Sequence, residues 1–231
     1  NDTGKVFRTT DGGNSWILTN HEIRQYLRSV GFFNENTGII GTLHDSLHIL
    51  YRTTDGGFNW TDITNSIQGT IPSGICGISI VNSTTAIATG RYYCPANIIR
   101  TTNAGLNWTS LPIDTSIIRS IVDCHFWSAD SGYIVGGYSS TNLFYNGKSV
   151  VAMTTNGGLN WTRVYISPRV NEWCWKIQFV NRLIGYVSIE RDFNLTYYLK
   201  TTDGGVSWSE KPFMVYDVEG IGFLNENTGW I

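Results

Sequence analysis

The 231-residue chain has few charged residues and lacks any long apolar run. Its 16 Lys and Arg nearly balance its 18 Asp and Glu, which leaves a formal net charge of -2. The basic stripe that a phosphate backbone requires is therefore missing, and we expect no nucleic-acid partner. No apolar stretch approaches the roughly 20 residues that cross a bilayer, so we expect no membrane insertion. The chain does not begin with Met, and we expect it to be a monomeric domain within a larger protein.

Lys, Glu and Ala are also scarce, whereas Gly, Asn, Thr, Ser, Trp and Tyr are frequent. This composition favours strands and tight turns, and we expect almost no helix. One motif, Thr-Thr-Asp/Asn-x-Gly-x-x-Trp, recurs five times at intervals of 44 to 53 residues, the range of propeller blades. Its acidic or amide residue and its tryptophan are Asp11 and Trp16, Asp55 and Trp60, Asn103 and Trp108, Asn156 and Trp161, and Asp203 and Trp208.

A second motif, in most copies Phe-x-Asn followed by a Gly, interleaves with the first and also has five copies. Apolar residues at its start alternate with a period of two, which predicts the innermost strand of a blade. The predicted core-facing pairs are Val30 and Phe32, Ile78 and Ile80, Cys124 and Phe126, Ile177 and Phe179, and Ile221 and Phe223. Five copies of each motif predict an all-β fold, a β-propeller of four-stranded blades with five blades present.

We expect one propeller domain over residues 1–231. The predicted blades cover approximately residues 222–231 plus 1–20, 21–65, 66–113, 114–167 and 168–213. In the first of these, segments from both ends of the chain would share one sheet, as in propellers that fasten their ring in this way. A closed five-bladed ring and a fragment of a larger ring are both open alternatives.

The first motif predicts a structural turn. An Asp or Asn side-chain oxygen can accept hydrogen bonds from backbone N–H groups two residues on, and the glycines tolerate positive φ. Ala104 replaces one glycine in the third copy, so we expect an ordinary backbone conformation there. The tryptophan should cover the hairpin, with its indole N–H directed at an acceptor.

These copies resemble the Asp-box, or bacterial neuraminidase repeat, Ser/Thr-x-Asp-x-Gly-x-x-Trp. The Thr-Thr-Asp-Gly-Gly variant, together with the upstream Phe-x-Asn strand, is most similar to propellers of the photosystem II assembly and stability factor family. The resemblance covers nearly the whole chain and implies the propeller fold. It leaves function open, because the same box occurs in sialidases, xyloglucanases, sortilin-type receptors and non-catalytic scaffolds.

The loops that differ from blade to blade carry the candidate binding residues. Aromatic rings beside Arg and carboxylates can stack on sugar faces or anchor a protein partner. The candidates are Arg28, Arg91, Tyr92, Arg119, Glu172, Trp173, Trp175 and Arg191. A core position is the alternative for one of the two tryptophans. We therefore expect a non-catalytic, exported module that binds a protein or a glycan through this loop face.

Two other functions are open alternatives. A sialidase-like or xyloglucanase-like glycoside hydrolase would need two facing carboxylates. The candidates are Asp123, Glu172, Asp217 and Glu219, and no pair stands out among them. An assembly factor for a membrane protein complex such as a photosystem is the other alternative. We expect no cofactor and no metal, since each repeated turn offers at most one carboxylate and His44 and His48 are the only close histidines.

Four cysteines form an even set, which is consistent with two disulfides in an oxidising compartment. Cys76 and Cys94 belong to one blade and are a possible disulfide. Cys124 and Cys174 lie on inner strands of neighbouring blades, where we expect buried thiols. An extracellular or periplasmic location follows as an expectation.

Overall fold

The structure is a computed structural model that describes residues 4–20, 23–43, 47–90, 96–139, 146–191, 194–216 and 218–231. These residues form strands and turns, with one short 3-10 helix at Thr64–Ser66. None of the described segments is a helix long and apolar enough to cross a membrane. The chain divides into two compact units, of which unit 1 is Asn1–Arg91 with Ile98–Leu111 and unit 2 is Tyr92–Asn97 with Pro112–Ile231.

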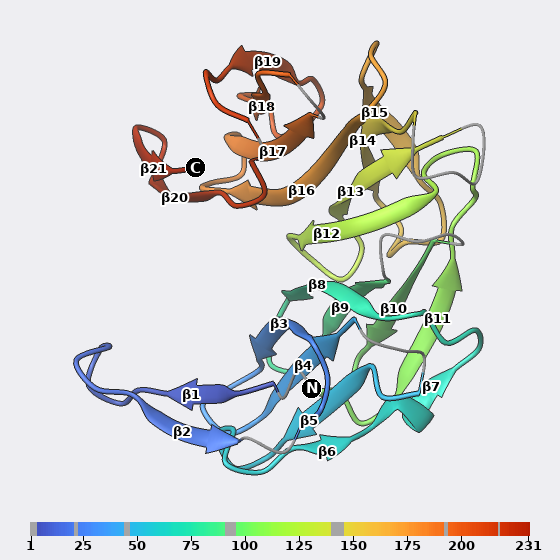
Figure 1. Cartoon of the computed structure of the whole chain (residues 1–231). Coiled ribbons are helices and arrows are strands. Elements are labelled where there is room, and N and C mark those ends of the chain that lie inside the picture. Colours follow the sequence, from blue (N-terminus) through green and yellow to red (C-terminus); the bar gives the residue numbers. More distant parts are fainter. Residues whose placement is uncertain are drawn as a thin grey trace. The chain divides into compact units, whose positions relative to one another are not determined.

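Unit 1 contains three sheets (Figure 1). The first is a hairpin of β1 (Val6–Arg8) and β2 (Ile17–Asn20). The second is an antiparallel sheet of β3 (Leu27–Phe32), β4 (Gly38–Thr42), β5 (Leu50–Thr53) and β6 (Thr61–Asp62). The third has the order β7 (Ile67–Gln68), β11 (Trp108–Pro112), β10 (Asn97–Thr101), β9 (Ala86–Gly90) and β8 (Ile75–Ile80). The short strand β7 runs parallel to β11 and was not predicted from the sequence.

Unit 2 also contains three sheets, and all of their strand pairs are antiparallel. One consists of β12 (Ser120–Phe126), β13 (Gly132–Tyr138), β14 (Lys148–Thr154) and β15 (Thr162–Ile166). The next consists of β16 (Glu172–Phe179), β17 (Gly185–Arg191), β18 (Tyr197–Thr201) and β19 (Ser209–Pro212). The last is a hairpin of β20 (Gly222–Asn225) and β21 (Thr228–Trp230).

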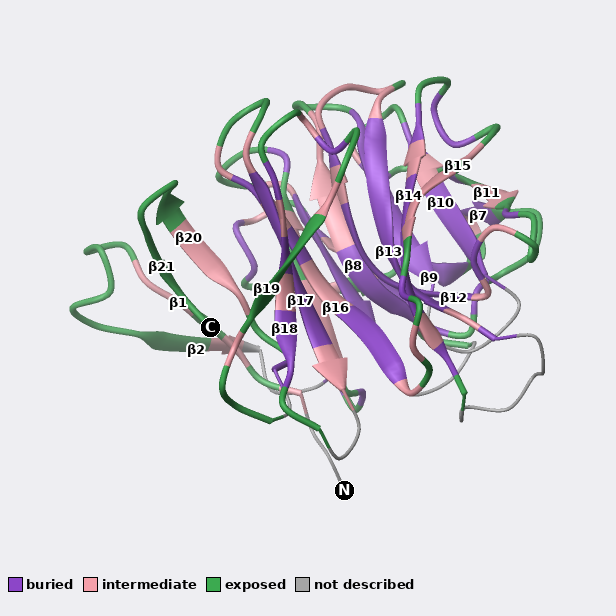
Figure 2. Cartoon of the chain, turned by 90° about the horizontal axis from the view of Figure 1, so that it is seen from above, coloured by how far each residue is buried: buried purple, intermediate pink, exposed green. Residues whose placement is uncertain are grey.

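The described strands thus form four complete sheets with the predicted consecutive strand order. Five blades are not confirmed, because the two halves of the remaining blade, β1–β2 and β20–β21, each form a separate two-stranded sheet. Figure 2 shows both hairpins mostly at intermediate or exposed burial, whereas central strands of the complete sheets, such as β13, β14 and β17, are largely buried. The extent of the domain and the blade boundaries stay predictions.

The threonine and the Asp or Asn of the repeated turn make the same hydrogen bonds in all five copies. The tryptophan indole bonds to the turn at Trp60, Trp108 and Trp161, whereas the indole N–H of Trp208 is buried without an acceptor. In the second copy the Thr53 hydroxyl donates to Asp55 (2.8 Å) and accepts the N–H of Gly57 (2.9 Å). The Asp55 carboxylate accepts the N–H of Asn59 at 2.9 Å, and these bonds lower the pKa of Asp55 to about 2. The N–H of Gly57, two residues after Asp55, donates to the Thr53 hydroxyl, so the prediction that the Asp55 carboxylate accepts it was wrong. The carboxylate instead accepts the N–H of Asn59, four residues on. The Trp60 indole donates to the carbonyl of Gly57, which fixes the ring over the turn.

The prediction for Ala104 was also wrong. Ala104 has φ +54°, close to the φ of +73° at the equivalent Gly56. The threonine and asparagine hydrogen bonds impose the left-handed conformation on this residue, and the strain of a non-Gly residue there is of order 1 kcal/mol.

Alternating residues of the inner strands build part of the core. Cys124, Phe126, Ile177 and Phe179 are buried as predicted. The other predicted residues are less buried: Ile78, Ile80, Ile221 and Phe223 are intermediate, and Val30 and Phe32 are 60% and 40% exposed. The core prediction for Val30 and Phe32 was wrong. Among the described residues of unit 1 they face only β1 and β2, which correspond to the two outer strands of a blade, so their cover is incomplete.

Candidate functional site

The loop end of the β16–β19 sheet brings together two of the predicted site residues. Glu172 and Arg191 are direct partners in the antiparallel register of β16 and β17. The Arg191 Nε lies 3.0 Å from the Glu172 carboxylate. The Glu172 side chain is fully buried, at 0% exposure, whereas Arg191 is half-buried. The hairpin therefore seals a carboxylate beneath an arginine.

Three further residues complete the surroundings of this carboxylate. Arg169, in the loop before β16, places its Nε 2.6 Å from Glu172. Tyr197, on β18, donates its hydroxyl to the same carboxylate at 2.6 Å, and the Ser167 hydroxyl donates as well. A buried carboxylate is stable only when paired and hydrogen-bonded, and these partners meet that requirement.

A second layer surrounds the first. The Arg169 guanidinium lies 2.8 Å from Glu210 on β19 and 4.7 Å above the Tyr197 ring. The Tyr165 hydroxyl donates to Glu210 at 2.7 Å and lies 3.0 Å from the Tyr197 hydroxyl. Burial, together with hydrogen bonds to Tyr197 and Glu210, raises the pKa of Tyr165. Burial opposes ionisation of Glu210, but its bonds to Arg169 and Tyr165 outweigh it and lower the pKa of Glu210.

We call these residues the Glu172 cluster; its members are Tyr165, Ser167, Arg169, Glu172, Arg191, Tyr197 and Glu210. Two arginines balance two glutamates within it, so it offers a partner no excess charge. The sequence indicated Glu172 and Arg191 as separate candidates. It did not single out Tyr165, Tyr197 or Glu210, whose strand-alternation pattern resembles that of ordinary core and surface positions.

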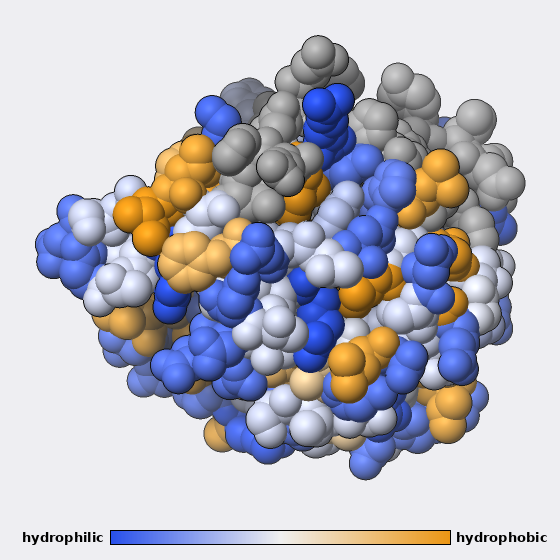
Figure 3. Space-filling model, turned by 90° about the horizontal axis from the view of Figure 1, so that it is seen from below, coloured by the Kyte–Doolittle hydropathy of each residue, from blue (hydrophilic) through white to orange (hydrophobic). Residues whose placement is uncertain are grey.

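The cluster holds two neighbouring loops. Arg191 donates to the carbonyl of Leu195 at 3.3 Å. The Thr196 N–H donates to the carbonyl of Val215 at 2.9 Å, which ties the β17–β18 loop to the β19–β20 loop. These loops present Leu195, Met214, Val215 and Tyr216, and Met214 and Tyr216 are 77% and 60% exposed. Elsewhere apolar side chains also reach the surface as separate groups among hydrophilic ones (Figure 3). The result is an apolar loop surface beside a buried, hydrogen-bonded ion cluster.

The two candidate tryptophans have different roles. Trp173 is buried against Gly137 and Gly147, where a Cβ on either glycine would collide with its ring. It is therefore a core residue. Trp175 is half-buried, and its indole N–H donates to the Glu190 carboxylate. Trp173 is therefore not an open stacking platform of the kind that sugar binding requires.

The remaining candidates do not join this cluster as far as the described residues show. Arg28 belongs to unit 1, and Arg119 directly precedes β12, where its N–H donates to Gly137 at 3.0 Å. Arg91 and Tyr92 lie outside the described residues.

The carboxylates weighed for glycoside hydrolysis are poorly placed for it. Glu172 is sealed by its arginines and has no surface for a substrate. Asp123 is buried, which raises its pKa, and it accepts the N–H of Ile177 at 3.2 Å and lies 3.6 Å from Lys176. Asp217 lies outside the described residues. Two facing, accessible carboxylates are thus not evident among the described residues.

The histidines and cysteines are the residues that bear on metal binding and disulfide formation. His44 lies outside the described residues, and His48 pairs with Asp62. The described part of the chain has no group of three or more His, Cys, Asp or Glu that could hold a metal ion. Cys76, Cys124 and Cys174 are buried, and burial raises the pKa of Cys174 to about 12. Cys94 lies outside the described residues, so its disulfide with Cys76 stays a prediction.

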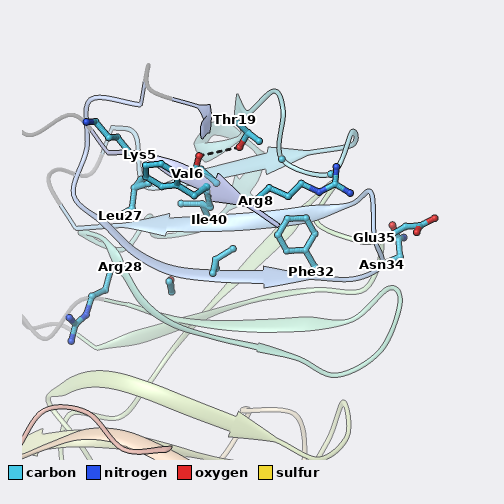
Figure 4. Close-up of a pocket in the computed structure, with 15 residues that line it drawn as sticks. Lys5, Val6, Arg8, Thr19, Leu27, Arg28, Phe32, Asn34, Glu35 and Ile40 are labelled. Carbon is cyan, nitrogen blue, oxygen red and sulfur yellow. Dashed lines mark hydrogen bonds between the residues drawn. The ribbon is translucent and has the colours of Figure 1, made fainter. Parts of the chain in front are cut away.

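Unit 1 has a cavity of about 710 Å³ between β1 and β3 (Figure 4). Its apolar lining includes Val6, Phe7, Leu27, Val30, Phe32 and Ile40. Lys5, Arg8 and Arg28 lie at its edges. Arg28, a predicted site residue, therefore borders an apolar groove that the sequence did not reveal.

No protein-family model matches the chain. Among solved structures, it is similar to YCF48 bound to D1 peptide, with 17% identity and a TM-score of 0.61 over 97% of this chain and 67% of that one. It is also similar to YCF48 from Cyanidioschyzon merolae, with 16% identity and a TM-score of 0.61 over 97% of this chain and 72% of that one.

Two glycoside hydrolase structures are similar as well. An ancestral GH74 enzyme has 20% identity and a TM-score of 0.67 over 91% of this chain and 28% of that one. The GH74 xyloglucanase from Xanthomonas campestris has 12% identity and a TM-score of 0.64 over 90% of this chain and 34% of that one. The chain thus spans about a third or less of the GH74 structures. At these identities the similarity shows the fold alone, which is all-β with a propeller arrangement.

Proposed function

We propose that the chain is a non-catalytic binding module that takes a protein segment through the apolar loop surface beside the Glu172 cluster. The observation that carries the proposal is the coupling of exposed Met214 and Tyr216 to a buried ion cluster through Arg191 and Thr196. A rigid base lowers the entropy that loops lose on binding, so apolar contacts there yield more affinity.

The chemistry of the surface favours a protein over a glycan. The cluster has no uncompensated charge, and Trp173, one of the two rings considered for sugar stacking, is buried. Aromatic and methionine side chains on a rigid base are typical of protein interfaces. The similarity to YCF48, whose solved structure holds a D1 peptide, supports a peptide-like partner. Assignment of the repeated turn to the Asp-box family is part of this proposal, supported by its common hydrogen-bond network.

A displayed library of random 12-residue peptides, selected on the purified chain, tests the proposal. We expect enriched peptides rich in apolar residues that lose affinity for a Met214→Ser, Tyr216→Ser variant. A Leu159→Ser, Val206→Ser variant, which removes two exposed apolar side chains from repeated turns, is the matched control. Absence of enrichment, or equal binding to all three proteins, would refute the proposed site. A glycan array and turnover assays with sialosides and xyloglucan check the alternatives.

A role as assembly factor for a membrane complex is the second candidate, favoured by the 97% of this chain that the YCF48 comparison covers. Co-purification from native membranes with a membrane protein complex would support it. Co-purification of soluble proteins alone would exclude this role.

The proposal includes an extracellular or periplasmic location, supported by the four cysteines. Peptide mapping of the native protein without reduction tests it. We expect a peptide pair linked through Cys76 and Cys94, and full alkylation of both thiols would contradict the location.

A further inference from the structure

The outer edge of one sheet in unit 1 carries an additional strand. Strand β7 runs parallel to the outer strand β11, with Ile67 opposite Trp108 and Gln68 opposite Thr109 (Figure 1). Ile67 is 6% exposed and belongs with Trp108 to one core cluster. Trp108 is 1% exposed, whereas the tryptophans of the other four copies of the repeated turn are half-buried or exposed. The added strand therefore accompanies complete burial of the tryptophan.

Strand β15 holds the equivalent place in unit 2 without such a strand. Trp161 and Thr162 correspond in the repeat to Trp108 and Thr109. The two tryptophans are held alike, since the indole N–H of each donates to the glycine carbonyl three residues before it. Among the described residues β15 pairs with β14 alone, and Trp161 is only half-buried. An unpaired strand edge of this kind is a template for a further strand.

The loop that approaches β15 from the preceding sheet does not provide this strand. In unit 1 the β7 segment ends beside Ser110, where a Cβ on Gly69 would lie 3.3 Å from the serine Cβ. Arg163 corresponds to Ser110, and its Nε donates to the carbonyl of Ile117 at 3.0 Å. The loop of residues 113–119 thus reaches the same point of the edge. It is described throughout and forms no strand with β15.

The outer strands of the other complete sheets are protected against strand addition. Strand β6 has two residues and is followed after one residue by the 3-10 helix. Strand β19 has the sequence Ser-Glu-Lys-Pro, and proteins use charged residues and proline to protect edge strands.

Strand β15 lacks these features. Its sequence, Thr-Arg-Val-Tyr-Ile, has high β-propensity and contains neither proline nor lysine. Its β-bulge lies between Arg163 and Tyr165, after the residues that correspond to the partners of β7. The first part of the β15 edge, at Trp161 and Thr162, is therefore suited to strand addition.

We propose that this part of the β15 edge binds an extended segment of a partner protein as a fifth strand, parallel to β15. The β7 pairs give the register: an aliphatic β-branched residue lies opposite Trp161 and a polar residue opposite Thr162, as Ile67 and Gln68 do in unit 1. A peptide main chain supplies the N–H and C=O groups that a strand edge requires, so the partner is a protein. Main-chain hydrogen bonds give the affinity, and the aliphatic residue on the Trp161 ring gives the specificity.

Disulfide capture of a probe peptide tests the site and its register. The probe has the sequence of residues 63–70, ITNSIQGT, with Gln68→Cys. It is incubated with Thr162→Cys protein at graded concentrations of a reducing thiol. The matched control is Ser209→Cys, at the equivalent exposed position of β19. We expect capture at residue 162 to withstand at least about a fivefold higher thiol concentration than capture at residue 209, because a few hydrogen bonds hold the probe there.

Two further comparisons separate this edge from other modes of capture. A probe that also carries Ile67→Asp should lose the preference for residue 162, because a charge does not pack on the Trp161 ring. Addition of Met214→Ser and Tyr216→Ser to the Thr162→Cys protein should leave capture unchanged, since the edge is a binding surface separate from the apolar loop surface.

Wild-type protein measures capture by the native cysteines, and far-ultraviolet circular dichroism verifies that the variants fold. Capture no greater than that of the wild type, equal capture at residues 162 and 209, or equal capture of both probes overturns the proposal. Loss of capture in the Met214→Ser, Tyr216→Ser background would place the probe on the loop surface and would also overturn it.

Discussion

Replacement of Glu172 by Gln tests whether the cluster is the base of the apolar loop surface. The substitution keeps the shape of the side chain and its capacity to accept from Tyr197 and Ser167, but removes its charge. Arg169 and Arg191 then lose the carboxylate that lies 2.6 Å and 3.0 Å from them. The remaining carboxylate of the cluster, Glu210, contacts Arg169 but not Arg191.

The magnitude follows from burial. Removal of one partner of a fully buried ion pair costs about 3–5 kcal/mol. The arginine side chains here are 32% and 28% exposed, so water compensates part of their lost pairing. We therefore expect a loss of about 2–3 kcal/mol in the free energy of unfolding. For a chain of this size that loss lowers the thermal midpoint by roughly 4–12 °C.

Calorimetry measures the thermal midpoint, and hydrogen exchange measures how well the loop amides are protected. We expect faster exchange at the Thr196 N–H, which bonds to Val215, because Arg191 no longer holds the loop. The control is Glu226→Gln, at an exposed position in the β20–β21 turn. A midpoint within 1 °C of the wild type, measured alongside this control, would show that the cluster does not stabilise the site.

Three further predictions concern the repeated turn and the core of unit 2. Thr154→Val leaves the buried N–H of Gly158 without its acceptor and should lower the free energy of unfolding by about 1–3 kcal/mol in urea titrations. Asn156→Asp should raise the thermal midpoint by roughly 1–3 °C at pH 7, because a second side-chain oxygen can then accept a hydrogen bond from Asn160, as Asp55 does from Asn59. This gain should vanish as the pH falls toward about 2, the pKa of the equivalent Asp55, because the carboxylate is then protonated. Burial lowers the pKa of His125 to about 4, so the folded protein takes up its proton later than the unfolded chain. Stability should therefore fall by up to about 3 kcal/mol between pH 6.5 and 4, and His125→Phe should flatten that part of the stability profile.

The sequence by itself predicted the local units. Each repeated turn closes its hydrogen bonds within eight residues, as Thr53 to Trp60 shows, so residue types and spacing suffice to identify it. The alternation of apolar residues placed the inner strands for the same reason. The conformation of Ala104 was missed because the side chain suggests an ordinary backbone, whereas the surrounding hydrogen bonds impose positive φ.

Tertiary structure decided which of these units cover one another and which charges meet. A period of two shows that Val30 and Phe32 share a face but not whether another sheet lies over it, and in unit 1 that cover is incomplete. Glu172 and Arg191 meet because a β-bulge and the β16–β17 register align them, and Glu210 joins from a strand 38 residues further along the chain. Such contacts depend on strand register and sheet packing, which no local pattern encodes.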